Sequence, residues 1–107
     1  MAIDVVWLQF AIDRLRHIHS YYTEKADRNI AQKITSEIVD ATAILSEQPN
    51  MGVVEQLLIH HNQKFRYIIV KNYKIVYWLN VTQNRVEIAN VFDVRQNPLR
   101  LKDFIDS

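Results

Sequence analysis

The residues with the clearest potential for chemistry are basic side chains on the segment FRYIIVKNYKIVYWLNV, residues 65–81. The basic residues within or beside this segment are Lys64, Arg66, Lys71 and Lys74. No Asp or Glu occurs between Glu55 and Glu87, so the sequence places no carboxylate close to these charges. The aromatic and β-branched residues that fill the rest of the segment favour a strand. A strand with uncompensated positive charge can hold an anionic group or an acidic partner.

Charge is distributed unevenly between the two halves of the chain. The net charge is +1, from 13 Lys and Arg against 12 Asp and Glu. Residues 1–52 carry five basic and seven acidic residues, whereas residues 53–107 carry eight basic and five acidic residues. The positive excess lies in the C-terminal half, and we expect an anionic or acidic partner to bind there.

Composition excludes several classes of site. A chain of 107 residues with 49% hydrophobic residues is long enough for one domain, residues 1–107, with a single core. The absence of Cys excludes disulfides and thiolate metal sites, and a single Gly excludes a glycine-rich phosphate loop. No apolar run approaches the ~20 residues of a membrane span, and the N-terminus MAIDVVW lacks the basic residues of a signal peptide. We expect a cytoplasmic protein with no membrane association, no metal and no cofactor.

Hydrophobic periodicity predicts a short strand at residues 3–7 and then two helices. The apolar positions of the first helix are Ala11, Leu15, Ile18 and Tyr22, and those of the second are Ile30, Ile34, Ile38, Ala41 and Leu45. The second helix ends before Pro49 and Gly52. The connection near residues 25–27 is short, so the helices should form an antiparallel hairpin that packs its isoleucine stripe into the core.

From residue 53 the period changes to about two, which predicts consecutive antiparallel strands. The predicted strands cover residues 53–61, 64–70, 73–80 and 85–91, and a short helix is predicted at residues 99–105. A two-residue loop at Lys71-Asn72 should join the two clearest strands, because Asn tolerates the positive φ of a hairpin turn. The resulting pairs are Val70 with Tyr73, Arg66 with Tyr77 and Ile69 with Lys74, with Tyr67 diagonal to Lys74 on the other face.

The order and spacing of many residues resemble the RelE/ParE superfamily of bacterial toxins. In the first half these residues are Trp7, Ala11, Asp13 to Leu15, Ile18 and Tyr22, then Ala31, Ile34, Ile38 and Leu45 before Pro49 and Gly52. In the second half, FRYIIVKNYKIVY and VEIANVFDVRQNP resemble strands of the ParE side. The resemblance implies an α+β fold of order β-α-α-β-β-β, with a helical hairpin on one face of an antiparallel sheet and a short C-terminal helix.

The resemblance also implies a function. Members are toxins of type II toxin–antitoxin systems, of the plasmid-stabilisation type, and a cognate antitoxin binds and neutralises them in a hetero-oligomer. ParE-like members inhibit DNA gyrase by binding, whereas RelE-like members cut mRNA on the ribosome. We expect the ParE-like activity. The alternatives are a ribosome-dependent endoribonuclease and a degenerate, non-toxic family member that only binds the antitoxin or serves as a regulatory partner.

The resemblance assigns three basic residues to the binding of target or antitoxin. Lys74 matches a basic residue in the nuclease strand, Arg95 matches the one after the last strand, and Arg66 lies within one residue of a third. In a nuclease they would stabilise the charge on the scissile phosphate, and Tyr67 is a weak candidate for proton transfer. A Tyr with an ordinary pKa near 10 is a poor base at pH 7, and residues 99–107 offer no Tyr or His. We therefore assign no catalytic residue.

Several polar residues have simpler interpretations. His60 and His61 should diverge as neighbours on a strand, so they are not expected to share a ligand. Lys64 and Lys71 lie at predicted strand ends, where charge protects a sheet edge. Arg66 could instead pair with Asp103 or Asp106, which would make it a structural residue.

Overall fold

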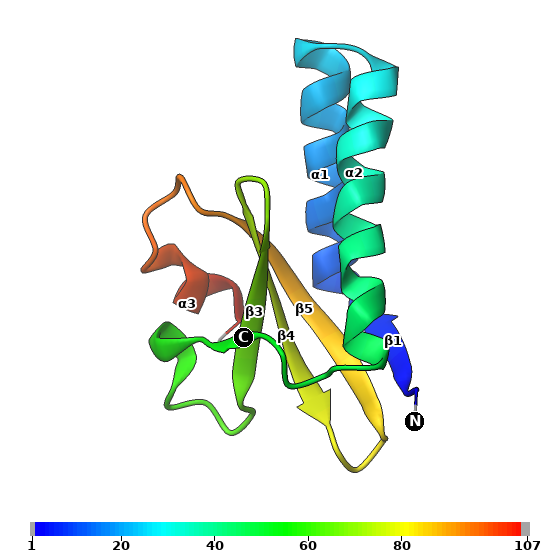
Figure 1. Cartoon of the computed structure of the whole chain (residues 1–107). Helices are drawn as coiled ribbons and strands as arrows, with labels where there is room; N and C mark the ends of the chain where they lie inside the picture. Colours follow the sequence, from blue (N-terminus) through cyan, green and yellow to red (C-terminus); the bar gives the residue numbers. More distant parts are fainter. Residues whose placement is uncertain (1, 106–107) are drawn as a thin grey trace.

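The computed structural model describes residues 2–105 and has three layers, with a helical hairpin on one face of a sheet and a short helix on the other (Figure 1). Along the chain the elements are β1 (Asp4–Trp7), α1 (Gln9–Lys25), α2 (Arg28–Thr42), the 3-10 helix η1 (Ala43–Ser46), β2 (Val53–Val54), the 3-10 helix η2 (Gln56–Leu58), β3 (Phe65–Val70), β4 (Tyr73–Asn80), β5 (Arg85–Asp93) and α3 (Arg100–Ile105). The predicted α+β fold is confirmed, including the terminal helix.

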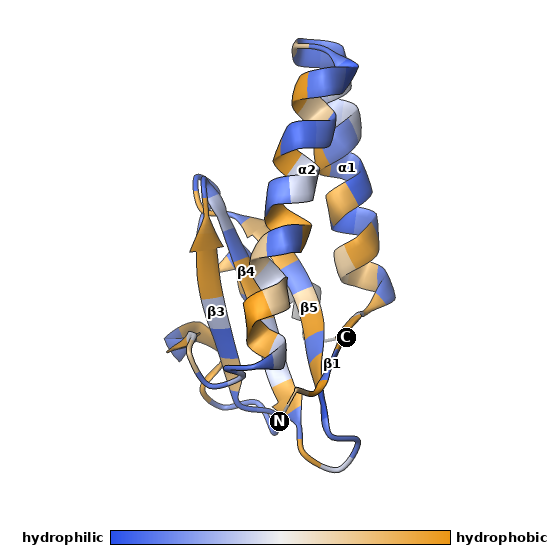
Figure 2. Ribbon diagram, turned by 45° about the vertical axis from the view of Figure 1, so that its right-hand side comes forward, coloured by the Kyte–Doolittle hydropathy of each residue, from blue (hydrophilic) through white to orange (hydrophobic). Residues whose placement is uncertain are grey.

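The helical hairpin turns at Ala26 and Asp27. The backbone N–H of Ala26 donates to Tyr22 and closes α1, and the Asp27 carboxylate accepts the backbone N–H of Ile30 at 2.9 Å. Asp27 therefore caps the N-terminus of α2, a contact that typically stabilises a helix by about 1 kcal/mol. The tip of the hairpin extends beyond the sheet and is mostly hydrophilic (Figure 2).

The buried stripe of α2 differs from the predicted isoleucine stripe. Ile38 and Leu45 are fully buried as expected, but Ile30 is 43% exposed near the tip of the hairpin. The buried positions of α2 are Ala31, Thr35, Ile38 and Thr42. The two Thr hydroxyls donate to backbone carbonyls of their own helix, at 3.0 Å and 2.7 Å, which allows polar residues to face the core.

The sheet has five strands in the order β1-β5-β4-β3-β2. β2, β3, β4 and β5 are antiparallel neighbours as predicted, whereas β1 pairs with β5 in parallel. The antiparallel expectation applied to strands that follow one another directly, whereas both long helices and three strands lie between β1 and β5 in the sequence. The pairing continues at the exit of β1, where the backbone N–H of Leu8 donates to the carbonyl oxygen of Ile88 at 3.0 Å.

The predicted strand at residues 53–61 is only two residues long. After Val54 the Glu55 side chain accepts the backbone N–H of Leu57 at 3.2 Å and turns the chain into η2. This local bond competes with strand pairing and ends β2.

The β3–β4 hairpin has the predicted register, with Val70 opposite Tyr73, Arg66 opposite Tyr77 and Ile69 opposite Lys74. The positive φ of the loop, 54°, lies at Lys71 and not at Asn72. The Lys71 ammonium lies 3.1 Å from the Glu37 carboxylate, so an ion pair joins the hairpin tip to α2.

Hydrophobic clusters fill both faces of the sheet. The cluster beneath the helical hairpin contains Ala11, Ile18, Ile38, Leu45, Tyr73, Ile75, Tyr77, Val86, Ile88 and Val91. The cluster beneath α3 contains Leu58, Phe65, Val76, Phe92 and Leu101. Within the described part of the chain, the helices are too short or too polar to cross a membrane.

Candidate binding sites

Lys74 lies on the α3 side of the sheet and is paired with an acid. Its ammonium is 2.6 Å from Glu55 Oε2, and the side chains are 17% and 4% exposed. The ammonium also lies 4.3 Å from the centre of the Tyr67 ring, a cation–π distance. The sequence-based view of Lys74 as uncompensated is therefore wrong, because the compensating carboxylate is 19 residues away along the chain.

Tyr67 shares the face of Lys74, which corrects the expectation that it lies on the other face. Tyr67 pairs with Val76 and Ile69 pairs with Lys74. Side chains alternate along a strand, so residues two apart lie on the same face and these four form one diagonal group.

Arg66 lies on the opposite face, where it holds the loop before β2. Its Nη1 donates to the carbonyl oxygen of Gly52 at 2.8 Å. The Tyr77 hydroxyl accepts the Gly52 backbone N–H at 2.9 Å and donates to the Pro49 carbonyl at 2.8 Å. Burial raises the pKa of Tyr77, so the phenol stays protonated and can donate this bond. The contact ties the chain at residues 49–52 to the sheet.

Gly52 is essential to this contact. A Cβ at this position would lie 2.6 Å from the Tyr77 hydroxyl oxygen and 2.8 Å from the backbone carbonyl oxygen of Tyr67. The proposed alternative partners of Arg66, the carboxylates of Asp103 and Asp106, lie outside the described side chains. Arg66 has a structural role regardless of them.

Arg95 forms a forked ion pair with Asp93 just after β5. Its Nε and Nη2 donate to the two carboxylate oxygens at 2.9 Å and 2.7 Å, and its backbone N–H donates to Oδ1 at 2.9 Å. These hydrogen bonds lower the pKa of Asp93, and the same carboxylate raises the pKa of Arg95. Arg95 is nevertheless 56% exposed, so a partner can reach it.

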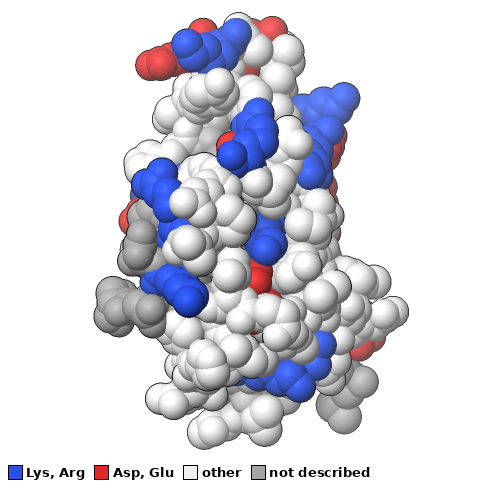
Figure 3. All heavy atoms as spheres, turned by 90° about the vertical axis from the view of Figure 1, so that its left-hand side faces the viewer, with Lys and Arg blue, Asp and Glu red and all other residues white. Residues whose placement is uncertain are grey.

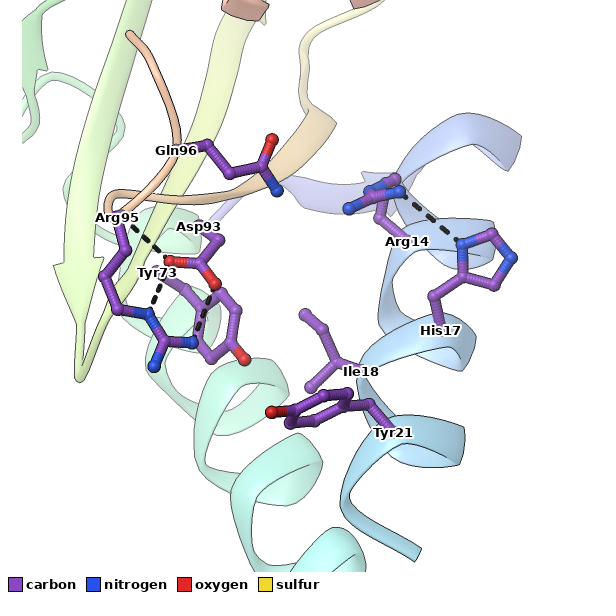
Figure 4. A pocket seen from close by; sticks show the side chains of 8 residues that line it. All are labelled: Arg14, His17, Ile18, Tyr21, Tyr73, Asp93, Arg95 and Gln96. Atoms are coloured by element: carbon purple, nitrogen blue, oxygen red, sulfur yellow. Dashed lines mark hydrogen bonds and ion pairs between the residues drawn. The ribbon is translucent and has the colours of Figure 1, made fainter. Parts of the chain in front are cut away.

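Arg95 and α1 border a groove of about 330 Å³ on the helical side of the sheet (Figure 4). The residues that line it are Arg14, His17, Ile18, Tyr21, Tyr73, Asp93, Arg95 and Gln96. The Tyr73 hydroxyl donates to the Tyr22 hydroxyl at 3.5 Å, and burial together with this bond raises the pKa of Tyr73. The buried Tyr73 phenol that lines the groove therefore stays neutral.

Sequence reasoning missed the α1 side of this groove. Arg14 and Tyr21 each lie three or four residues from both His17 and Ile18, which places the four residues on one helix surface. That spacing is a signal in the sequence, but it identifies a site only when β5 brings Arg95 to the same place.

The three predicted basic residues do not converge. Lys74 lies on the α3 face, whereas Arg66 and Arg95 lie on the helical face at opposite ends of the strands. Arg66 pairs with Tyr77, and Asp93 pairs with Tyr73, four residues away on β4. Four strand residues span about 13 Å. No single phosphate can contact all three side chains in this arrangement.

The α3 side of the molecule carries its positive charge in separate groups, several of them next to carboxylates (Figure 3). On this side His60 and His61 border one hollow with Leu57, Asn62 and Lys102. They follow η2 and lie in a turn, so the expectation of divergence along a strand is wrong. Among residues 2–102, no three His, Cys, Asp or Glu side chains are close enough to hold a metal ion.

Comparison with known proteins identifies the family. The chain is similar over 87% of its length to a solved chromosomal ParDE toxin–antitoxin system from P. aeruginosa, with a TM-score of 0.72, 16% sequence identity and 97% of that chain covered. None of the curated protein sequences matches significantly. Residues 5–98 match the model of the family described as the ParE toxin of type II toxin–antitoxin systems, parDE. The chain therefore belongs to the ParE toxin family.

Proposed function

We propose that this ParE-family toxin acts by binding DNA gyrase, and that its cognate antitoxin neutralises it in the cytoplasm. Family membership supports the toxin and the existence of an antitoxin partner. The gyrase target and the mode of neutralisation extend beyond family membership, and the separation of the basic residues supports action by binding.

The observation that carries this proposal is that Lys74, Arg66 and Arg95 each already have a partner within the protein and do not lie together. RNA cleavage needs a base, an acid and positive charge around one phosphate. Lys74 is held by Glu55 on one face, and Arg66 is held by Gly52 on the other. This arrangement disfavours the ribosome-dependent endoribonuclease and favours contacts to a protein surface.

The edge of β3 offers a surface for the antitoxin. β2 pairs only with Arg66 and Tyr67, so within the described chain the outer edge of residues 68–70 carries no strand. Ile69 and Val53 are 54% and 60% exposed beside it. An extended antitoxin segment would gain backbone hydrogen bonds and bury these apolar side chains.

A supercoiling assay tests the target. Purified wild-type chain should inhibit supercoiling of relaxed plasmid by gyrase, and co-purified product of the adjacent reading frame should restore it. Primer extension on mRNA from induced cells should detect no new cleavage. Full gyrase activity at tenfold molar excess of toxin, together with cleaved mRNA, would reverse the assignment in favour of the nuclease. Full gyrase activity without growth arrest would indicate the degenerate member.

A matched pair of variants tests whether the exposed arginine takes part. Arg95→Gln should weaken gyrase inhibition, whereas Lys33→Gln, which removes an exposed charge on α2, should not. Equal inhibition by both variants would remove Arg95 from the binding surface without affecting the choice of target.

A further inference from the structure

A second hollow, of about 290 Å³, lies on the α3 side of the sheet and shares no lining residue with the groove beside Arg95. Three of its lining residues form one row across the sheet. Phe65 on β3 is opposite Trp78 on β4, which is opposite Glu87 on β5, so the three side chains point to the same face. Glu87 is the only acid among the described residues that line this hollow. The hollow therefore combines aromatic rings with a single carboxylate.

The Glu87 carboxylate is nearly buried but retains an oxygen that can accept a hydrogen bond. The residue is 6% exposed. Its Oε2 accepts from Asn80 Nδ2 and from Arg85 Nε, each at 2.9 Å. Within residues 2–102, the hydrogen bonds to this carboxylate end on Oε2 alone. A carboxylate that has lost most of its water is stabilised by each further donor, so Oε1 favours the binding of a donor that enters the hollow.

The same face of the sheet already holds a cation in a comparable environment. The Lys74 ammonium lies 2.6 Å from Glu55 Oε2 and 4.3 Å from the centre of the Tyr67 ring. A carboxylate beside an aromatic ring attracts a cation through both groups. Four residues further along β4, Trp78 lies beside Glu87 and repeats this combination. Trp attracts cations more strongly than Tyr does.

We propose that this hollow binds an arginine side chain of the toxin's protein target, with the guanidinium against Glu87 Oε1 and the ring of Trp78. The inference rests on the proposed function, because it takes the target to be a protein surface. A guanidinium is planar, stacks on aromatic rings and is more weakly hydrated than an ammonium, so it enters a partly apolar site at a lower cost. A hollow of about 290 Å³ accommodates one such side chain.

Arg85 holds Glu87 from outside the hollow. Its side chain is 37% exposed, it contacts Oε2, and it does not line the hollow. Its charge offsets part of the attraction of Glu87 for a second cation, although solvent screens an exposed guanidinium. Removal of the Arg85 charge should therefore strengthen the binding of a cation, whereas removal of the Glu87 charge should weaken it. These opposite signs distinguish a cation site from an apolar hollow.

An NMR titration tests the inference on the full-length protein. The probe is the capped tripeptide Gly-Arg-Gly, added to ¹⁵N-labelled chain at low salt. A matched tripeptide carries citrulline in place of arginine, which keeps the shape of the side chain and removes its charge. We expect the arginine peptide to shift the indole N–H of Trp78 and the backbone amide of Glu87, with a dissociation constant on the order of 1 mM. The citrulline peptide should bind about fivefold more weakly.

Three variants separate the roles of the charges. Glu87→Gln keeps an acceptor oxygen for Asn80 and should weaken binding of the arginine peptide about tenfold. Arg85→Gln should tighten it about twofold, and this variant keeps the inference testable if Glu87→Gln does not fold. Glu24→Gln removes an exposed acid at the tip of the helical hairpin and is the charge-matched control. It should change the affinity less than twofold.

Three outcomes would overturn the inference. They are equal affinity for the two peptides, equal affinity of Glu87→Gln and Glu24→Gln for the arginine peptide, and weaker binding in Arg85→Gln. The wild-type gyrase assay reports the proposed function separately. Peptide binding without gyrase inhibition would refute the target alone, and gyrase inhibition without peptide binding would refute the hollow alone.

Discussion

Two ion pairs on opposite faces of the sheet have similar chemistry and different surroundings. Lys74 and Glu55 meet at 2.6 Å with Glu55 buried and Lys74 17% exposed, whereas Arg95 and Asp93 meet at 2.7 Å beside an open groove, with Arg95 56% exposed. A largely buried pair stabilises the fold as a unit, because removal of one partner leaves an uncompensated charge in the protein interior. An exposed pair costs little to rearrange. Burial therefore distinguishes Lys74, which is largely enclosed by the fold, from Arg95, which is accessible and for which we propose a binding role.

The largest expected effect is the loss of the Lys74 ammonium. Lys74→Met leaves the Glu55 carboxylate buried without its partner and should lower the free energy of unfolding by about 3 kcal/mol. Urea denaturation followed by circular dichroism measures the change. The double variant Lys74→Met/Glu55→Gln removes both charges and should recover most of the loss. If the single variant is as stable as the wild type, the buried pair is not structural.

The second largest effect is expected in the loop at residues 49–52, which Arg66 contacts. Gly52→Ala places a Cβ against the Tyr77 hydroxyl and the Tyr67 carbonyl, and should destabilise the fold by about 2 kcal/mol. Thermal unfolding by calorimetry measures it. Gln48→Ala, at an exposed position in the same connection, is the control. A melting temperature equal to that of wild type would mean that residues 49–52 do not depend on this contact.

A smaller effect of opposite sign is expected at the hairpin tip. Lys71→Gly relieves a positive φ that costs a side chain about 1 kcal/mol, but it loses a half-exposed ion pair with Glu37. The net gain should be about 0.5 kcal/mol in the free energy of unfolding. Glu37→Gln removes the ion pair alone and isolates that loss. If Lys71→Gly lowers the free energy of unfolding more than Glu37→Gln does, the positive φ of Lys71 is not strained.

The smallest effect on stability is expected from Arg95→Gln, and its signature is a pH dependence. The pKa of Asp93 is lower in the folded protein than its ordinary value near 3.9, so the ionised carboxylate stabilises the fold at any pH above that value. This stabilisation is lost as the pH falls through the lowered pKa. Arg95→Gln should flatten the loss between pH 4 and pH 2, measured by urea denaturation at each pH. An unchanged pH profile would show that Arg95 does not hold Asp93 in solution.

The sequence predicted local features of the fold well. The register of the β3–β4 hairpin followed from a two-residue loop, and the helical hairpin followed from two apolar periods with a short connection. Both depend on residues close in sequence. Strand propensity did not predict the short β2, because the Glu55 side chain accepts a hydrogen bond from the backbone N–H of Leu57 and turns the chain away.

The candidate sites were predicted less well, for a physical reason. The order of charges along the chain does not show which carboxylate lies beside which cation. Glu55 follows β2, and the pairing of β2 with β3 brings its carboxylate to Lys74. Arg95 was identified from the resemblance, but its neighbours Arg14 and Tyr21 come from a helix more than 70 residues earlier. Spacing on one element cannot show which other element will face it.

The parallel pairing of β1 has a consequence for synthesis. β1 has β5 as its sole neighbour in the strand order, and its residues 4–7 pair with residues 85–88. On the ribosome β1 is synthesised about 80 residues before the segment of β5 that pairs with it. The helical hairpin can form before β5 is synthesised, whereas β1 can join the sheet only afterwards, across a loop of about 80 residues. A newly made toxin is thus incomplete until its last strand emerges.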